Sequence, residues 1–475
     1  MFFTFFGDDE RFINQFSRHV GLEMTEAKDY FGDYALTKVP EPETRTFLNQ
    51  LMIFMGVLAV WAAVFAGAAL ASWYDAATLV VSVVIGCIIL GIIAYLTGYI
   101  GSRTRASTYV IFRHSMGRVV AMIAGLIVSG ISATIWFAYE TWLFGVIMQG
   151  VFPDIPFMRV EVASIWGGLL MMTTAIIGYR ALAALSYLLV PAWFVIIPMA
   201  LAAAIDMNGG WGALMAAKPP TPMDIGVGIT FTVGVYIVGA TIAPDITRYS
   251  RKPHDGPLAW FIHVVVFMPI IMAAGGFLQL LAPGVNLAAA MVSLGMVWAV
   301  LLTGVVGQWS TNDNNLYSAS LAWCNAIPIK RVYWVAIMGI IGTVVAALIA
   351  LGFGVSLNAL LLLGSFLGTW IPPMAAVMIA DFYIVKPFLL GVKAVEKRYE
   401  WGSGTAYHLV NWPAVVAIIV GGFLAWWIPQ VYPTVPGVVV GFCVSLILFI
   451  LLMAACVKLG IKYGIGKWVE TEKGF

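Results

Sequence analysis

The chain has 475 residues, of which 61% are hydrophobic and only 10% are charged. Soluble domains carry about 25% charged residues, so this composition excludes a water-soluble globular protein and predicts a chain that lies mostly in a membrane. The formal net charge of +2 is too small to indicate binding to nucleic acid, whereas the 18 Trp and 18 Tyr suit membrane–water interfaces.

The N-terminal segment, residues 1–46, differs from the rest of the chain because acidic side chains stand there among scattered aromatics. It has neither the basic start nor the apolar core of a signal peptide, and we expect a cytoplasmic tail. From residue 48 onward, apolar stretches succeed one another, each reaching the roughly 20 residues that cross a bilayer. About twelve spanning helices are predicted, at 48–72, 77–100, 119–149, 160–179, 185–206, 225–247, 257–281, 290–322, 331–351, 356–384, 409–430 and 434–457.

Basic side chains orient these helices. They recur in every second loop, after the second, fourth, sixth, eighth and tenth predicted spans, and again in the C-terminal tail at 458–475. The intervening loops contain little more than Arg159 and Lys218. Because loops rich in Lys and Arg stay on the cytoplasmic side, we expect a multi-pass protein of the cytoplasmic membrane with both termini in the cytoplasm.

Two predicted spans contain residues that weaken a helix. The first has Gly56 and a run of small residues at 66–68, and the sixth has Gly239 followed by Pro244. Such residues interrupt the hydrogen bonds within a helix, although small residues also serve close helix–helix contact. Interrupted helices at corresponding places in two halves of a chain are typical of a transporter binding site, and these two spans are five apart.

Polar residues concentrate in the eighth predicted span. From Gln308 to Asn315 every residue except Trp309 is polar. A water-filled or ligand-filled site explains this density, and a polar clamp between helices is the alternative. One face of the helix carries Ser310, Thr311, Asn314 and Asn315. Hydroxyl and carbonyl oxygens suit a hard cation such as sodium, and amides suit the edge of a planar heterocycle.

An aromatic and an acidic side chain mark the third span. Trp136 and Glu140 are four residues apart, so they share a helix face. Ionisable groups at membrane depth cost about 2.5–3.5 kcal/mol on insertion scales and usually face a cavity or a partner. A ring and a carboxylate together make a cradle for a flat, hydrogen-bonding ligand, and ordinary packing is the alternative for Trp136 alone. Tyr236, just before the interruption of the sixth span, is a candidate for a second aromatic wall.

These residues belong to motifs that resemble the nucleobase–cation symporter-1 family, whose members include permeases for cytosine and for hydantoin. The resemblance extends over residues 48–457, almost the whole spanning region. Its motifs are Gly98–Gly101, Trp136–Leu143, Ala243–Tyr249, Trp309–Asn314, Ile371–Pro373 and Ala380–Phe382. It implies an all-helical LeuT-type fold with two inverted five-helix repeats, at 47–206 and 207–384. A cytoplasmic loop and two additional helices at 385–457 come after these repeats.

The resemblance also implies a substrate site in the middle of the membrane, with the substrate ring stacked between two aromatic side chains. The residues expected to contact the substrate are Val60, Trp136, Glu140, Tyr236, Asn312, Asn314 and Asn315. Glu140 stands where hydantoin-type relatives have an amide, and Val60 stands where an aromatic residue is expected. Small polar residues that flank the sixth-span aromatic in relatives fall at Val235 and Val238 here. The site has therefore lost some polar contacts and gained a carboxylate, which favours a ligand with several N–H donors or a cationic one.

A sodium site is implied as well, built from backbone carbonyls of the first and eighth spans and from two hydroxyls. The candidate ligands are Gly56, Ala59, Gly307, Ser310 and Thr311. Proton coupling stays open as an alternative, because a buried Glu140 or Asp313 would be able to carry a proton. Asp245 and Arg248, one helical turn apart at the end of the sixth span, are expected to form a structural or gating ion pair, and Asp313 is a further gating candidate.

The predicted function is import of a nucleobase or a related planar nitrogen heterocycle, coupled to sodium, by alternating access. A cation-coupled or proton-coupled transporter of an amine, a thiamine precursor or an amino acid is the alternative, since Glu140 would also pair with a cationic substrate. A channel would need a continuous polar lining, and an enzyme would need a nucleophile–base set or metal ligands, neither of which we recognise. We expect no enzymatic activity, no cofactor besides the coupling ion, and no partners beyond the substrate and the lipid bilayer.

Overall fold

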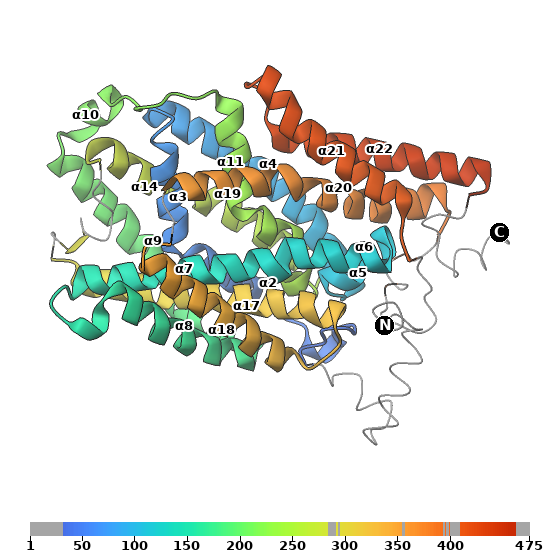
Figure 1. Cartoon of the computed structure of the whole chain (residues 1–475), viewed down its shortest axis with the longest axis horizontal. Coiled ribbons are helices and arrows are strands. Elements are labelled where there is room, and N and C mark those ends of the chain that lie inside the picture. The colour runs from blue at the N-terminus through green and yellow to red at the C-terminus, as the bar shows by residue number, and fades with distance from the viewer. Residues whose placement is uncertain are drawn as a thin grey trace.

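The computed structural model describes residues 32–283, 291–292, 295–353, 357–392, 395, 399 and 409–461. The ends of the two expected tails, 1–31 and 462–475, lie outside these residues. The described part of the chain is helical, apart from a single β-bridge between Arg45 and Ser250. Figure 1 shows the helices lying alongside and across one another around the short helix α3.

The first half of the chain consists of α-helices, two short 3₁₀ turns and one π-helical segment. These elements are η3 (Glu41–Glu43), α2 (Phe47–Leu58), α3 (Trp61–Leu70), α4 (Ala76–Thr104), α5 (Thr108–Met116), α6 (Arg118–Gly125), π-helical η4 (Leu126–Ile131), α7 (Ser132–Val151), η5 (Pro156–Met158), α8 (Val160–Ile177), α9 (Tyr179–Met207) and α10 (Gly210–Ala216). The second half contains α11 (Ile225–Thr241), α12 (Pro244–Thr247), α13 (Asp255–Ile262), π-helical η6 (His263–Phe267), α14 (Met268–Leu281), α16 (Val297–Leu301), π-helical η7 (Leu302–Val306), α17 (Gly307–Ala326), α18 (Arg331–Ala350), α19 (Leu357–Trp370), α20 (Pro372–Ala380), π-helical η8 (Asp381–Leu389), α21 (Trp412–Val431) and α22 (Gly437–Leu459).

The described helices account for the predicted membrane spans. Ten are long and apolar enough to cross a membrane, and an eleventh span results when α2 and α3 are counted as one bent span. About twelve are predicted from the sequence, and the difference is the eighth span, which consists of α16, η7 and α17. Its second half carries the polar run from Gln308 to Asn315, which makes α17 less apolar than the other spans.

Local sequence explains where several helices begin. Thr46 and Asp75 precede α2 and α4, and their side-chain oxygens accept hydrogen bonds from the backbone N–H groups of Asn49 and Thr78, at 3.4 and 2.9 Å. Such caps satisfy donors that have no partner inside the helix. Hydrogen bonds from Thr78 hold the pKa of the Asp75 carboxyl below its ordinary value. Pro244 begins α12, a position at which a helix needs no N–H donor.

The first span is broken, as the sequence predicts. α2 ends at Leu58, α3 begins at Trp61, and the two helices meet at an angle of 54°. Val60 between them is extended, with φ −133° and ψ 143°. The sixth span is interrupted more mildly, because α11 continues through Gly239 to Thr241 and forms one continuous span with the short helix α12.

The helices beside the cavity form two groups, one of which includes the broken span. One group, which we call the scaffold, consists of α7, α8, α17 and α18, and the other, which we call the bundle, consists of α2, α3, α4, α11, α12, α13 and α14. In the bundle, Gly67 of α3 lies against the backbone carbonyl of Met272, and Gly275 of α14 lies against that of Val64, so neither glycine leaves space for a side chain. α21 and α22 pack on each other and on α20, at the edge of the molecule in Figure 1.

Candidate functional site

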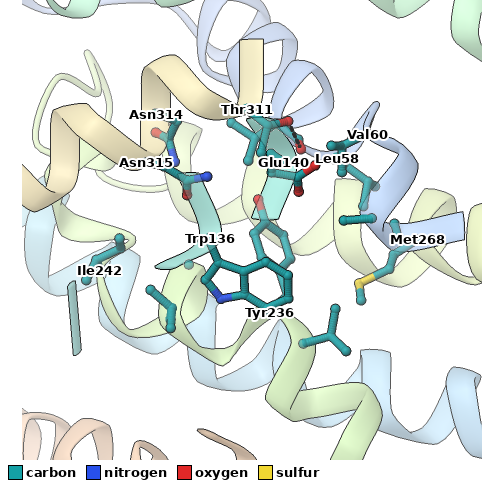
Figure 2. A pocket seen from close by; sticks show the side chains of 16 residues that line it. Leu58, Val60, Trp136, Glu140, Tyr236, Ile242, Met268, Thr311, Asn314 and Asn315 are labelled. Carbon is teal, nitrogen blue, oxygen red and sulfur yellow. Dashed lines mark hydrogen bonds between the residues drawn. The ribbon is translucent and has the colours of Figure 1, made fainter. Parts of the chain in front are cut away.

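A cavity lies between the two groups of helices, beside the break in the first span (Figure 2). It contains about 600 Å³ of empty space, part of which is continuous with solvent. Its lining comes from the bundle and from two scaffold helices. The lining residues are Val57, Leu58, Val60, Ala62, Ala63, Trp136, Glu140, Val235, Tyr236, Val238, Gly239, Ile242, Met268, Thr311, Asn314 and Asn315. Six of the seven residues predicted to contact a substrate are among them.

Two aromatic rings form walls of this cavity. Trp136 comes from α7 and is only 6% exposed, and its indole Nε1 is buried without a hydrogen-bond partner. Tyr236 comes from α11, where its ring stacks on Trp260 at 5.1 Å between centroids and an interplanar angle of 24°. The edge of His263 meets the same tyrosine ring at 5.6 Å. Trp260 and His263, which do not line the cavity, thus pack against the ring of Tyr236. One predicted aromatic wall lies on each group of helices.

Glu140 carries the only acidic or basic side chain among the described residues that line the cavity. It is 2% exposed, and its carboxylate Oε2 accepts a hydrogen bond of 2.7 Å from Nε2 of Gln308. Gln308 also donates to the Glu140 backbone carbonyl at 3.1 Å and accepts from the N–H of Trp61 at 3.2 Å. The sequence places Gln308 in the polar run but does not single it out. A buried amide in an apolar region needs both a donor and an acceptor as partners, and this requirement could have marked Gln308 as a residue that joins several helices.

The three asparagines in the polar run of α17 have different surroundings. Asn314 and Asn315 line the cavity, and Oδ1 of Asn314 is buried without a hydrogen-bond partner. Asn312 is fully buried away from the cavity, and its Nδ2 donates to Thr141 Oγ1 at 3.0 Å. The expectation that Asn312 contacts the substrate is therefore wrong for this structure, because its amide joins α17 to α7. It reaches the cavity only through Asn315, whose Nδ2 donates to Asn312 Oδ1 at 3.3 Å.

The predicted cation ligands meet at the end of α2 and the start of α17. The N–H of Val60 donates to Leu58 O at 2.7 Å instead of to Gly56 O, so the hydrogen-bond ladder of α2 ends there and releases carbonyl groups. The hydroxyl of Thr311 lies 2.9 Å from Val57 O. A side chain on Gly56 would meet Ser310 of α17, together with Ser186 of α9, and one on Gly307 would meet the carbonyl of Ala59.

This arrangement fits a hard monovalent cation. It combines the negative end of the α2 helix dipole with carbonyl and hydroxyl oxygens, and such half-helix ends bind Na⁺ in transporters of this architecture. The Ser310 hydroxyl lies 3.4 Å from the Ser186 hydroxyl, so Ser186 is one further oxygen nearby that sequence reasoning did not include. Among the described residues, no cluster of three His, Cys, Asp or Glu side chains is placed to bind a metal ion.

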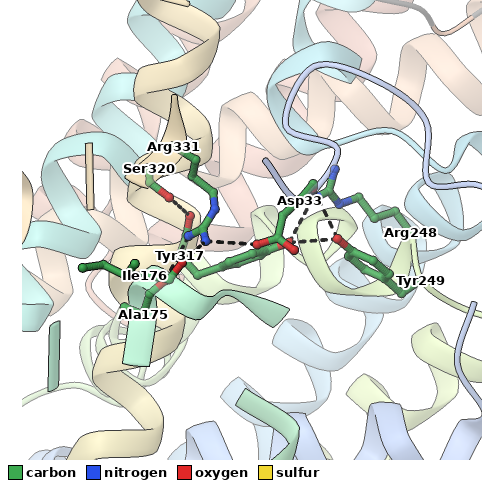
Figure 3. A network of polar contacts seen from close by, with 8 residues as sticks. All are labelled: Asp33, Ala175, Ile176, Arg248, Tyr249, Tyr317, Ser320 and Arg331. Carbon is green, nitrogen blue, oxygen red and sulfur yellow. Dashed lines mark hydrogen bonds and ion pairs between the residues drawn. The ribbon is translucent and has the colours of Figure 1, made fainter. Parts of the chain in front are cut away.

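A second polar network lies at the end of the helices where residues 32–39 pack (Figure 3). The guanidinium of Arg248, which comes directly after α12, donates to the carbonyls of Tyr34 and Asp33 at 2.6 and 2.7 Å and to the Tyr317 hydroxyl at 2.9 Å. The Asp33 carboxylate forms an ion pair of 3.1 Å with Arg331 of α18. This network therefore connects the bundle to the scaffold through the segment before α2.

The gating pair predicted from the sequence is wrong in its partners. The Asp245 carboxylate accepts a hydrogen bond from the N–H of Thr108 at 2.9 Å, and the contact that Arg248 makes with Asp245 is to its backbone carbonyl, at 3.0 Å. The ion pair of this network joins the Asp33 carboxylate to Arg331, and composition could not reveal it because acidic residues are frequent throughout 1–46. Asp313, the other gating candidate, lies between α17 and α8, where Thr174 donates to its Oδ1 at 2.6 Å.

Comparison with known proteins gives the family. A family model for permeases of cytosine/purines, uracil, thiamine and allantoin matches residues 38–449. The chain belongs to this permease family. Cytosine permease of Escherichia coli (strain K12) is 28% identical over 402 residues, which cover 83% of this chain and 89% of that protein. The resemblance recognised in the sequence is thereby confirmed, and so is the expectation that the chain is a membrane transporter and not an enzyme.

Solved structures show the same fold at low sequence identity. Mhp1, a nucleobase-cation-symport-1 family transporter in a closed conformation with bromovinylhydantoin bound, matches with a TM-score of 0.71 at 18% identity, covering 92% of this chain and 95% of Mhp1. A Na⁺-coupled sialic acid symporter matches with a TM-score of 0.58 at 14% identity, covering 91% of this chain and 92% of the symporter. The permease thus has the predicted LeuT-type fold.

Proposed function

We propose that this permease carries a nucleobase or a closely related planar nitrogen heterocycle across the membrane by alternating access. The observation that supports this most strongly is the composition of the cavity wall, where two aromatic rings, a carboxylate and two amides surround one space. Rings supply stacking, which discriminates little, and polar groups supply hydrogen bonds that select the edge of the heterocycle. Membership of a family of permeases for cytosine, purines, uracil, thiamine and allantoin agrees with this chemistry.

Sodium is the coupling ion in this proposal. The carbonyls of Gly56, Ala59 and Gly307 and the hydroxyls of Ser310 and Thr311 would hold it at the break of the first span. When bound, the ion supplies positive charge that draws the end of α2 and the start of α17 together. The solved sialic acid symporter of the same fold is Na⁺-coupled, which supports the choice of ion.

The transport cycle requires the bundle and the scaffold to move relative to each other. In the structure, the network of Asp33, Arg248, Tyr317 and Arg331 connects these two groups at one end. We propose that this end faces the cytoplasm, in accordance with the basic loops, and that the network opens when the substrate is released there. The termini then lie in the cytoplasm, and the protein resides in the cytoplasmic membrane.

A screen of thermal stability tests the substrate class. Cytosine, uracil, adenine, guanine, hydantoin and a thiamine precursor are each added to the purified permease, in sodium and in choline buffer. A ligand that binds the folded protein raises its melting temperature. We expect a heterocycle from this set to stabilise the wild-type protein and to lose this effect in Trp136→Ala. Stabilisation by none of them would reject the proposal.

An amine or an amino acid is the second candidate substrate. It is favoured by one observation, that Glu140 has no basic partner among the described residues of the cavity wall. A cationic ligand would neutralise this carboxylate directly. The same screen distinguishes the two candidates when aliphatic amines and amino acids are included, because only a cationic ligand would lose its effect entirely in Glu140→Gln while showing no dependence on Trp136.

A further inference from the structure

One buried amide joins the broken span to the acidic group of the cavity. Gln308 lies in the first turn of α17 and has no exposed surface. Its Oε1 accepts a hydrogen bond from the N–H of Trp61, at the start of α3. Its Nε2 donates to the carboxylate and to the backbone carbonyl of Glu140, on α7. Three helices that carry different parts of the site therefore meet at a single side chain.

The residues beside Gln308 are the candidate cation ligands. Gly307 precedes it directly, and Thr311 lies one helical turn further along α17, with its hydroxyl 2.9 Å from Val57 O. A cation bound there would contact both the end of α2 and the start of α17. The amide of Gln308 would respond to a change at this break, because its oxygen accepts a hydrogen bond from the first N–H of α3, on the other side of the same break.

The same amide fixes the orientation of Glu140. Both contacts come from one NH₂ group, and together they hold the carboxylate and the backbone of α7 in one relation to α17. One oxygen of the carboxylate is thus occupied by Gln308, and Glu140 faces the cavity in Figure 2 with Trp136 from the same helix. A displacement of the Gln308 amide would change the group that is positioned to select the substrate.

We propose that Gln308 is the positioning residue that couples cation binding to substrate binding. This inference rests on the proposed sodium-coupled transport and names the residue that connects the cation site to the substrate site. The amide links the backbone at the break of the first span to the Glu140 carboxylate. A bound cation therefore fixes the orientation of the carboxylate, and the substrate binds more tightly.

The coupling factor is the quantity to measure. It is the ratio of the substrate dissociation constants in choline and in sodium buffer of equal ionic strength, determined with whichever of cytosine, uracil, adenine, guanine or hydantoin stabilises the wild-type protein. Coupling between two sites typically changes affinity about 5- to 150-fold. In Gln308→Met, which keeps the length of the side chain but removes both polar groups, we expect the ratio to fall to about 1–2.

Two further variants make this test decisive. Gln308→Asn keeps the amide but is too short to reach both partners, so it loses the coupling without placing an apolar group in the site, and it replaces Gln308→Met if the latter does not fold. Ser445→Ala is the matched control, since Ser445 is equally buried and donates to Ala417 O at 2.9 Å between α21 and α22. Its coupling factor should equal that of the wild-type protein.

The outcomes separate this inference from the proposed function. A wild-type ratio well above 1 that persists in the Gln308 variants would overturn the role of Gln308 and leave sodium coupling intact. A wild-type ratio of 1 would reject both. A variant that is merely less stable would show a lower melting temperature with an unchanged ratio, which also counts against the inference.

Discussion

Removal of the Trp136 ring is the perturbation whose effect on the binding site can be worked out most directly from the structure. Trp136 lines the cavity, so a ligand there can stack on the part of its ring that faces the empty space. Stacking of a base on an aromatic side chain contributes about 1–3 kcal/mol. At 1.4 kcal/mol for each factor of ten, Trp136→Ala should weaken substrate binding about 5- to 150-fold. Trp136→Phe keeps a smaller ring and should lose part of this amount.

The chain offers a matched control on the same helix. Trp142 and Trp136 both contact the ring of Tyr139, at 5.6 and 5.9 Å between centroids, but Trp142 does not line the cavity. Trp142→Ala therefore removes a similar intramolecular contact without removing the stacking surface. Equilibrium binding of a radiolabelled heterocycle to the purified protein measures both variants. Unchanged affinity in Trp136→Ala, or an equal loss in Trp142→Ala, would refute the stacking assignment.

Three other parts of the structure give further expected outcomes. Thr311→Ala removes a hydroxyl from the cation site and should raise the sodium concentration that half-maximally supports uptake about tenfold, which corresponds to about 1.4 kcal/mol; an unchanged sodium titration would exclude this hydroxyl as a ligand. Asp33→Asn breaks the ion pair with Arg331 and should increase the rate at which thiol reagents label cysteines introduced at that end of the cavity, whereas equal labelling would mean that the network does not hold this end closed. Gly67→Leu should lower the melting temperature because a side chain there meets the backbone of α14, whereas Gly212→Leu, which has open space, should not; similar effects of the two substitutions would contradict the close packing of α3 on α14.

Much of the architecture could be predicted because it depends on properties that add up along the chain. Apolar runs of sufficient length locate the spans, and helical periodicity places Trp136 and Glu140 on one face of α7, where both line the cavity. Val60 was placed by resemblance to the family, and Tyr236 both by its position before the interruption of the sixth span and by that resemblance. The break of the first span was predicted because small residues weaken a helix there, although only the structure locates the break between Leu58 and Trp61.

Contacts between distant elements could not be predicted in the same way. Periodicity places Asn312 in the polar run but does not show that its amide faces α7 instead of the cavity. Sequence spacing suggests an ion pair between Asp245 and Arg248, whereas in the folded chain the Asp245 carboxylate accepts a hydrogen bond from the backbone N–H of Thr108. The hydrogen bonds of Gln308 could not be predicted either, since its partners lie 247 and 168 residues away along the chain.

Accumulation of an unmodified heterocycle inside sealed vesicles is the direct test of the proposal that this cavity is the transport site. Proteoliposomes that contain the wild-type permease are given an inward sodium gradient and a radiolabelled heterocycle that stabilises the protein in the thermal screen. The internal label is identified by chromatography. We expect that the label accumulates above its external concentration, that it is chemically unchanged, and that Trp136→Ala strongly reduces the accumulation. Equal internal label in protein-free vesicles, or uptake that is the same in Trp136→Ala, would contradict the assignment of this cavity as the transport site.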